Sequence, residues 1–542
     1  MTNKIIVLLT FCMAAACAGA QQKTYVSEVW RPDNGNGTYT NPVINADYSD
    51  PDAIRVGDDF YMVASSFDAV PGLPILHSRD LVSWGIVGHA LLRQPPYDVF
   101  SKTQHGNGVW APSIRYHNNA FYIYYPDPDF GIYMVKAQTI TGPWSDPVLV
   151  EAGSGLIDPC PLWDADGKAY LVHAYAGSRA GIKSILVVKE MNSDGTRTTT
   201  AGRIVFDGHD QDPTLEGPKF YKRNGYYYIF APAGGVATGW QLVLRSKNVY
   251  GPYERRVVMA QGRSPVNGPH QGAWIDTKNG EDWFLHFQDK GAIGRVVHLQ
   301  PMKWQNDWPV IGTDEDHDGT GTPVLTARKP DIANGGPVQT PVETDEFNTP
   351  DLGLQWQWQA NPEASWSFMH PAKGVLRLFA QPLSPDVKSL WQVPNVLLQK
   401  FPGDAFTATT KIRFSPNEKV VGEKAGLTTM ALDYASIAIK KKKEGLYLVV
   451  SACREADKGN AETETEIARL NSGEVYLRMQ YHTDGTYRFS YSPDGKDFKP
   501  AGNSMKAVPG KWIGIKMGLF ITSPVKTNDA GFADVDWFRI TR

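Results

Sequence analysis

Five short runs of aromatic and aliphatic residues recur along the N-terminal part of the chain, at intervals of roughly 50 to 60 residues. That spacing is typical of one four-stranded blade of a β-propeller. Turn pairs such as Asp166-Gly167 and Asn224-Gly225 stand just before the runs and are strong hairpin signals. The repeat therefore predicts an all-β domain of five blades. The runs occupy residues 60–63, 121–124, 169–172, 226–229 and 282–285.

A second repeat lies about ten residues upstream of each run, and equivalent positions in the blades of a closed propeller surround its axis. Three of its five members carry carboxylates, although like charges placed together repel one another. A turn-forming role before proline would explain any one of these acids, but not their repeated placement. We therefore expect one central functional pocket. The members are Asp50-Pro51-Asp52, Trp110-Ala111-Pro112, Asp158-Pro159, Glu216-Gly217-Pro218 and Gly268-Pro269-His270.

Such a trio of acids meets the needs of glycoside hydrolysis. One carboxylic acid protonates the leaving oxygen, and one carboxylate acts on the anomeric carbon or on its attacking water. A third acid beside the proton donor raises the donor's pKa and orients it. Asp50, Asp158 and Glu216 supply these groups without any cofactor. The pattern alone leaves inverting and retaining chemistry open.

The repeat ends at Gly312. Residues 313–344 are rich in Gly, Pro, Thr and Asp, which is typical of a linker or covering strap. From residue 345 to 542, short alternating segments separated by turns such as Asp484-Gly485 and Asp494-Gly495 predict a second domain, a jelly-roll-like β-sandwich. The propeller is predicted to span residues 21–312.

Residues 1–20 have the pattern of a signal peptide, with Lys4 before an apolar run and Ala18-Gly19-Ala20 at the cleavage position. They predict export to the periplasm, with a lipoprotein anchored at Cys17 as the alternative. No later segment is apolar enough to predict a membrane span. Charged residues make up 20% of the chain and the formal net charge is −3, so charge gives no reason to expect a nucleic acid or an anionic membrane as partner. Cys160 and Cys453 are expected as separate buried thiols.

If the protein binds calcium, we expect the ion to have a structural role and not a catalytic one. Asp314, Asp316, Asp318 and Gly319 imitate the first half of an EF-hand loop, but Leu325 occupies the position of the closing acidic ligand. A weak calcium contact or a solvated turn is therefore expected there. A second conceivable cation position would join Asp345 or Glu346 to Asp534 or Asp536.

The order of these motifs resembles glycoside hydrolase family 43. The resemblance runs through the whole propeller, and the C-terminal sandwich is similar to the one found in the xylosidase and arabinofuranosidase branch of that family. The residues that carry it are Asn41-Pro42-Val43, Asp50-Pro51-Asp52, Ser65-Ser66-Phe67, His77-Ser78-Arg79-Asp80-Leu81 with Trp84, Trp110-Ala111-Pro112, Ile157-Asp158-Pro159, Glu216-Gly217-Pro218 and Gly294-Arg295.

The resemblance implies an inverting mechanism. In it Asp50 is the general base that activates water, Glu216 is the general acid, and Asp158 tunes and orients Glu216. An inverting pair of carboxyl groups stands roughly 6.5 to 9.5 Å apart to admit the water.

The resemblance also implies residues that bind the terminal sugar, namely Phe67, Trp110, His270, Gln271 and Arg295. His270 matches an axial histidine that often touches a water-coordinated calcium, although here the family's usual context is altered to Gly268-Pro269-His270-Gln271-Gly272. Arg295 matches an arginine that reaches the sugar or the catalytic base.

The function expected from this resemblance is exo-acting release of terminal α-L-arabinofuranose from plant cell-wall oligosaccharides or polysaccharides. A β-D-xylosidase, or an enzyme that accepts both sugars, is the close alternative. A non-catalytic sugar-binding propeller is the alternative from another class, and the intact acid trio argues against it.

Overall fold

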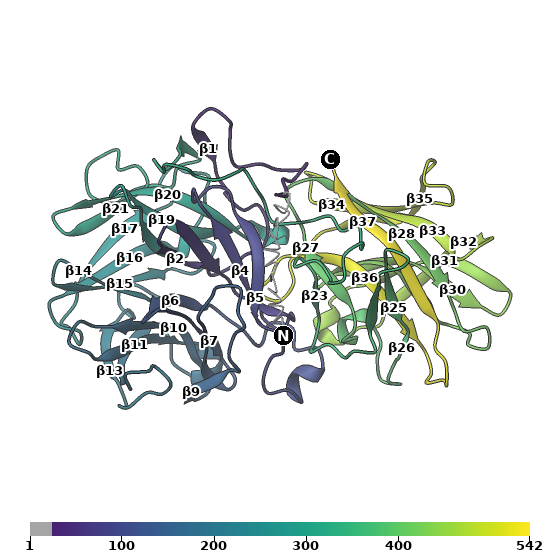
Figure 1. Ribbon diagram of the computed structural model, residues 1–542, viewed down its shortest axis with the longest axis horizontal. Coiled ribbons are helices and arrows are strands. Elements are labelled where there is room, and N and C mark those ends of the chain that lie inside the picture. The colour runs from purple at the N-terminus through teal and green to yellow at the C-terminus, as the bar shows by residue number, and fades with distance from the viewer. Residues whose placement is uncertain (1–23) are drawn as a thin grey trace, which may run out of the picture.

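The computed structural model describes residues 24–542, and the predicted signal peptide lies outside them. It confirms the all-β prediction. A five-bladed β-propeller, at the left of Figure 1, is followed by a β-sandwich at the right. No helix among the described residues is both long and apolar enough to span a membrane.

Each blade is a four-stranded antiparallel sheet whose strands follow one another in sequence. The first contains β2 (Asp52–Val56), β3 (Asp59–Val63), β4 (Gly72–Ser78) and β5 (Gly85–Leu91). The second contains β6 (Ser113–His117), β7 (Ala120–Asp127), β8 (Gly131–Ala137) and β9 (Val148–Ala152). The third contains β10 (Leu156–Trp163), β11 (Ala169–Tyr175), β12 (Ile185–Met191) and β13 (Arg203–Asp207). The fourth contains β14 (Lys219–Arg223), β15 (Tyr226–Ala233), β16 (Trp240–Ser246) and β17 (Glu254–Ala260), and the fifth β18 (His270–Asp276), β19 (Asp282–Asp289), β20 (Arg295–Gln305) and β21 (Trp308–Ile311).

Turn chemistry explains the first hairpin of several blades. Asn224 and Gly225 join β14 to β15 with φ angles of 49° and 74°, and Asn118 and Asn119 join β6 to β7 with 47° and 60°. Type I′ turns require positive φ at both central residues, which Asn and Gly tolerate best. The aromatic runs identified in the sequence form the second strand of each blade, and most of their side chains are buried.

The first strands of the blades surround the axis. β2 contacts both β18 and β6, and β10 contacts both β6 and β14. The chain preceding β2 closes the ring, because Ile44 forms a backbone bridge with Val297 of β20 and the side chain of Asn41 bonds both backbone groups of Leu299. Apolar side chains of the first and last blades merge into one buried cluster at this seam.

The sandwich consists of two sheets around a single core. One sheet has the order β23 (Gln357–Trp358), β27 (Leu397–Lys400), β36 (Lys516–Ser523), β29 (Lys424–Met430), β30 (Tyr434–Lys442), β31 (Gly445–Cys453) and β32 (Thr463–Leu470), with β26 (Gln381–Pro382) beside β36. The other has the order β24 (Ser367–His370), β25 (Val375–Phe379), β37 (Phe532–Thr541), β28 (Phe406–Ser415), β33 (Glu474–Tyr481), β34 (Thr486–Ser492) and β35 (Lys499–Lys506).

The burial of the strands distinguishes the two sheets. In β28 and β33 buried and solvent-facing residues alternate, as expected for a sheet with one face in water. β36 belongs to the first sheet, which is covered on both faces, and all eight of its residues are buried. Its second face packs on the segment around η3 (Leu390–Gln392), in a cluster that includes Trp391, Val396 and Phe520.

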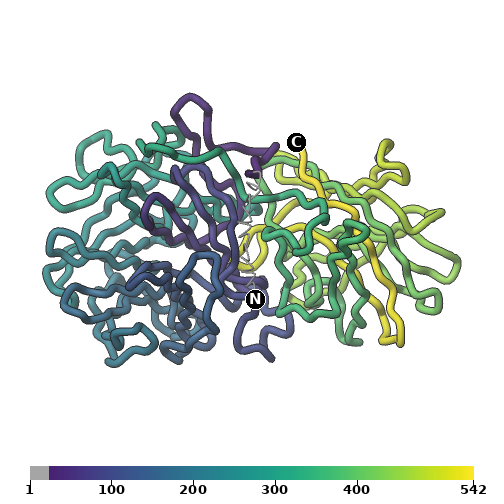
Figure 2. The backbone as a smooth tube through the Cα atoms, in the orientation of Figure 1, coloured from purple at the N-terminus to yellow at the C-terminus, as the bar shows by residue number. Residues whose placement is uncertain are grey.

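The strap between the domains is ordered and packs on the propeller. β22 (Thr326–Arg328) pairs with β1 (Thr38–Thr40), and buried Glu343 accepts hydrogen bonds from Tyr25, Ser27 and Trp30. Figure 2 shows the purple start of the described chain beside the yellow C-terminus, where Arg542 Nε donates to the carbonyl of Glu28 at 2.7 Å. The remaining elements are short: α1 (Gly177–Ala180), η1 (Val99–Ser101), η2 (Gly291–Ile293) and η4 (Ala456–Lys458).

The two cysteines of the described chain, Cys160 and Cys453, are both buried and free, as the sequence predicted.

Candidate active site

The five repeated motifs lie at the beginnings of the first strands, at one end of the propeller axis. Asp50, Trp110 and Glu216 come just before β2, β6 and β14, Asp158 lies within β10, and His270 begins β18. A cavity of about 280 Å³ opens at this end. Its lining brings together most of the side chains predicted from the sequence: Asp50, Phe67, Trp110, Asp158, Glu216, Gln271 and Arg295.

Asp50 is buried and held by three side chains. Its Oδ2 accepts hydrogen bonds from Ser65 Oγ at 2.6 Å and Ser49 Oγ at 3.1 Å, and its Oδ1 lies 3.1 Å from Arg295 Nη1. These contacts fix the direction of the carboxylate, while Arg295 supplies a compensating positive charge. These contacts orient Asp50 as a proton acceptor for a water in the cavity would need to be oriented, beside the positive charge of Arg295.

Asp158 lies beside the other two acids. Its Oδ2 accepts the backbone N–H of Gly217, the residue after Glu216, at 2.7 Å. Burial raises the pKa of Asp158 to about 8, the charge of Glu216 contributes next, and Asp50 adds a smaller effect. Burial and the charge of Glu216 thus favour the protonated form of Asp158, whose Oδ2 fixes the backbone carrying Glu216.

Glu216 is the most accessible of the three acids, with 26% of its side chain exposed. Its Oε1 lies 3.0 Å from Nε2 of His270, which is almost completely buried. His270 therefore orients Glu216 from behind instead of lining the cavity itself, which differs from its predicted role as a sugar contact.

Four of the residues that line the cavity have left-handed backbone conformations, which are uncommon for residues other than glycine. The φ angles are 55° at Asp50, 53° at Phe67, 56° at Asp158 and 38° at Gln271. Two of them lie at irregularities in strand pairing, between Ile157 and Cys160 in β10 and between His270 and Gly272 in β18. A β-bulge of this kind redirects side chains, and strained backbone is concentrated at functional sites. The local backbone thus aims Asp158 and Gln271 toward the cavity.

Three aromatic rings form one wall of the cavity. The centroid of Trp110 lies 6.4 Å from that of Phe67 and 6.3 Å from that of Trp512. Trp110 is held by a hydrogen bond to the carbonyl of Gly106, and the guanidinium of Arg179 lies 5.3 Å from the centre of its ring. Aromatic faces of this type pack against the C–H surface of a sugar.

Trp512 belongs to the sandwich and was missed by sequence reasoning. It lies on the loop before β36, has a φ of 67° and is 50% exposed, yet it lines the cavity together with propeller residues. A tryptophan in a loop between Gly510 and Gly514 was the one signal that the sequence carried. That signal does not indicate which surface the ring covers.

Gln271 provides a free hydrogen-bond donor. Its Nε2 is buried and has no partner among the described residues, although the side chain lines the cavity. An unpartnered buried amide is costly unless a ligand satisfies it. This group is therefore suited to donate to a sugar hydroxyl, which is the role that the sequence predicts for it.

The residues around His270 do not fit a directly held calcium ion. Calcium prefers six to eight oxygen ligands, whereas His270 bonds Glu216 through Nε2 and its Nδ1 is buried without a partner among the described residues. In the described part of the chain, the group of acids and histidines close enough to share an ion is Asp314, Asp316 and Asp318, far along the chain in the strap.

The other suggested cation position is occupied by protein contacts. Asp345 accepts the backbone N–H of Phe347 and the Nε1 of Trp356, whereas Glu346, Asp534 and Asp536 pair with Arg539, Arg377 and Lys411 respectively. These four acids are therefore engaged separately.

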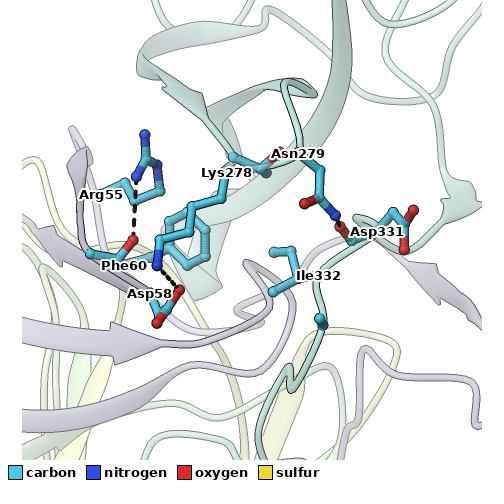
Figure 3. A pocket seen from close by; sticks show the side chains of 10 residues that line it. Arg55, Asp58, Phe60, Lys278, Asn279, Asp331 and Ile332 are labelled. Carbon is cyan, nitrogen blue, oxygen red and sulfur yellow. Dashed lines mark hydrogen bonds and ion pairs between the residues drawn. The ribbon is translucent and has the colours of Figure 1, made fainter.

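A second hollow of about 80 Å³ lies at the hairpin ends of the first and last blades. Figure 3 shows it, with Lys278 directed toward Asp58 and Asn279 toward Asp331. Arg55 is paired with Asp276. Because its charged groups neutralise one another and its volume is small, we assign no chemistry to it.

Comparison with known proteins identifies both domains. Residues 39–309 match the sequence model of glycosyl hydrolases family 43. Residues 344–541 match the model of the β-xylosidase C-terminal concanavalin A-like domain. The resemblance found in the sequence is therefore confirmed over the propeller and the sandwich.

Three relatives have similar sequences over most of the chain. A putative β-xylosidase of Xylanibacter ruminicola is 40% identical over 90% of this chain and 87% of its own length. A β-xylosidase of Formosa agariphila is 32% identical over 93% and 90% respectively. A non-reducing end α-L-arabinofuranosidase of Bacteroides ovatus is 30% identical over 92% and 94%.

The solved structures include the xylan β-1,4-xylosidase of Bacillus halodurans. It is 26% identical, covers 93% of this chain and 100% of its own, and superposes with a TM-score of 0.81. The similarity spans the propeller and the sandwich together.

Proposed function

The chain belongs to glycosyl hydrolase family 43, and on that premise we propose that this glycosidase removes single terminal β-D-xylose units from plant cell-wall glycans with inversion of configuration. The observation that carries the proposal is the convergence of Asp50, Asp158 and Glu216 on one aromatic-walled cavity. Among the residues that line it, Arg295 is the sole cation. A binding protein has no need for a proton donor and a proton acceptor in such a place.

The proposed reaction uses two of the carboxyl groups directly. Asp50 takes a proton from a water molecule as that water attacks the anomeric carbon. Glu216 gives its proton to the glycosidic oxygen as the bond to the leaving group breaks. Asp158 and His270 act through Glu216, the first by fixing the adjacent backbone and the second through its ring nitrogen.

The terminal sugar is proposed to rest against Phe67 and Trp110, with the Gln271 amide donating to a hydroxyl. The partial exposure of Glu216 suits an acid that must reach the bond between this sugar and the rest of the glycan. Trp512 would then cover the cavity from the sandwich side, where it favours a chain end over the middle of a polymer.

The preference for xylose is supported by the relatives described above, of which one is named a β-xylosidase and another a putative β-xylosidase. The family resemblance of the sequence favoured α-L-arabinofuranose, and the Bacteroides ovatus relative keeps that sugar as the second candidate. The two sugars present similar hydroxyl patterns, so activity on both is compatible with the same site.

The test compares 4-nitrophenyl β-D-xylopyranoside with 4-nitrophenyl α-L-arabinofuranoside, with purified protein. The proposal predicts the larger kcat/KM for the xyloside. A larger value for the arabinofuranoside would move the function to the second candidate, and inertness toward both would favour a sugar-binding role. Proton NMR of the first product formed from a β-xyloside should show α-xylose, and initial β-xylose would exclude inversion.

The predicted leader gives a separate proposal, that the protein acts in the periplasm after export. Fractionation of the producing cells, with antibody detection, should place it with soluble periplasmic markers. Recovery with the membrane fraction would favour the lipoprotein alternative.

A further inference from the structure

Asp47 stands where the propeller, the sandwich and the cavity meet. We infer that Asp47 is a positioning residue that couples Arg295, the cation on the proposed base, to the sandwich loop that carries Trp512. The inference rests on the proposed function, because it assigns a role within that same site. Asp47 is 4% exposed and makes no contact with the cavity itself.

On the propeller side, Asp47 fixes the start of β20. Its Oδ1 accepts the backbone N–H of Arg295 at 2.9 Å, and the N–H of the next residue, Tyr48, donates to the carbonyl of Arg295 at 3.0 Å. The side chain of Arg295 then reaches Asp50 Oδ1 at 3.1 Å. The position of the guanidinium on the proposed base therefore depends on a backbone that Asp47 anchors.

On the sandwich side, the second oxygen of the same carboxylate holds the loop before β36. Asp47 Oδ2 accepts the N–H of Gly514 at 2.9 Å, and the N–H of Ile515 donates to the carbonyl of Ala292 at 2.8 Å. Trp512 lies two residues before Gly514, so its ring enters the cavity from a loop fixed at its base.

The junction has no room for rearrangement. A Cβ on Gly294 would lie 2.6 Å from Asp47 Oδ1 and 2.7 Å from the Cα of Gly514. A Cβ on Gly514 would lie 2.0 Å from the carbonyl oxygen of Ile293. Three backbones therefore meet around one carboxylate, and displacement of any of them moves the others.

The charge of Asp47 is also matched to its surroundings. The ammonium groups of Lys400 and Lys516 are buried at the same interface, and desolvation lowers the pKa of Lys400 to about 8 and also lowers that of Lys516. The negative charge of Asp47 opposes both shifts. An amide at this position would keep one acceptor but lose both the second acceptor and the charge.

The test is Asp47→Asn, with Asp404→Asn as the matched control. Asp404 also joins the two domains, through Lys290 and Asn45, but contacts neither Arg295 nor the Trp512 loop. We expect Asp47→Asn to lower kcat about tenfold and to raise KM and the inhibition constant of D-xylose about fivefold, because misplacement by a fraction of an ångström weakens an oriented site. Asp404→Asn should leave all three within twofold.

KM and the inhibition constant do not depend on the fraction of enzyme that is folded. They therefore distinguish a misplaced active site from a mere loss of stability. A double-mutant cycle with Trp512→Ala adds a second criterion. If Asp47 acts partly through Trp512, the rise in KM caused by Asp47→Asn should be smaller once Trp512 is gone. Unchanged KM and inhibition constant in Asp47→Asn would overturn the inference, even if the melting temperature falls.

Asp47→Ser, which retains one acceptor in a smaller side chain, is the second variant in case the first does not fold. Failure of both to fold would also overturn the inference, because Asp47 would then be a structural residue. If the wild-type enzyme cleaves neither aryl glycoside, the proposed function has failed independently. The coupling is then judged by calorimetric binding of D-xylose to the wild type and to the same variants, with an unchanged dissociation constant counting against it.

Discussion

Two hollows in the described part of the protein are each lined by three carboxylates and have similar volumes. The axial cavity of the propeller has a volume of about 280 Å³. A hollow of about 350 Å³ lies on the outer sheet of the sandwich, which is the sheet that contains β28 and β33 and has one face in water. The first contains Asp50, Asp158 and Glu216, and the second contains Glu474, Asp534 and Asp536.

The two hollows differ in how the negative charge of each carboxylate is balanced by neighbouring groups. On the sandwich, Glu474 pairs with Arg413, Asp534 with Arg377 and Asp536 with Lys411, and the Arg413 guanidinium lowers the pKa of Glu474. In the cavity, burial and the neighbouring acids raise the pKa of Asp158 instead. Acids that pair with cations on an exposed sheet stay ionised, whereas a buried acid with a raised pKa, such as Asp158, can exchange protons at ordinary pH.

The most severe test of this contrast removes one acid from each hollow. Asp50→Ala and Glu216→Ala should each lower kcat about 10²- to 10⁴-fold, since general acid and base groups contribute that much. Glu474→Ala should stay within twofold. Glu216→Ala should lose less activity on a 4-nitrophenyl glycoside than on a xylo-oligosaccharide, because nitrophenolate leaves without a proton. Full activity in either cavity variant would contradict the assignment, and circular dichroism verifies folding.

Asp158 sharpens the contrast through pH. Its pKa is raised from the ordinary 3.8 to about 8, so the folded protein binds more protons than the unfolded chain between those values. Its contribution to stability is therefore greatest at low pH and is lost as pH rises toward 8. Asp158→Asn should lower kcat about 10²-fold and raise Tm relative to the wild type by an amount that grows between pH 5 and pH 8.

Calorimetry of both proteins at several pH values measures that difference. Other buried acids with raised pKa values, such as Asp127 and Glu343, are present in both proteins and cancel. A Tm difference independent of pH would show that Asp158 does not titrate in this range.

A smaller effect is expected for aromatic residues of the sandwich. Trp512→Ala should raise KM about tenfold, which corresponds to roughly 1.4 kcal/mol of lost stacking and burial. Trp537 lies on the outer sheet beside Tyr476 and Arg539, and Trp537→Ala should leave KM unchanged. Equal KM values for the two variants would remove Trp512 from the site.

The smallest effect concerns the outer ion pairs. Arg413 is 64% exposed on its side chain, so its pair with Glu474 is screened by water. Arg413→Ala should change the free energy of unfolding by about 0.5 kcal/mol and leave kcat/KM unaltered. Urea unfolding at low and high salt measures it, and a loss above about 2 kcal/mol would contradict the view that these pairs are mainly a solubility feature.

Much of the fold could be predicted because its signals are local. Blade size follows from the interval between hydrophobic runs, and hairpin positions follow from residues such as Asn118 and Asn224 that tolerate positive φ. Equivalent positions in equivalent blades must surround the axis, so the repeat alone is enough to place Asp50, Asp158 and Glu216 together.

Other features had no local signal. His270 was expected as a sugar contact but lies behind Glu216, because the irregular pairing after His270 directs Gln271 to the cavity in its place. Trp512 and Gly514 lie in a loop whose sequence gives no indication of what it covers. Their role depends on how the propeller and the sandwich pack against each other.

The sequence by itself determined the blades, the ring of acids and the family, since each depends on residues close together or repeated at a fixed interval. Only the tertiary structure decided how the wall of the cavity around those acids is completed. Asp47 and Gly514 are 467 residues apart in the chain, yet their hydrogen bond joins the propeller to the loop that supplies the last wall of the cavity. Contacts over that separation are set by the packing of whole domains, and no periodicity within either domain encodes them.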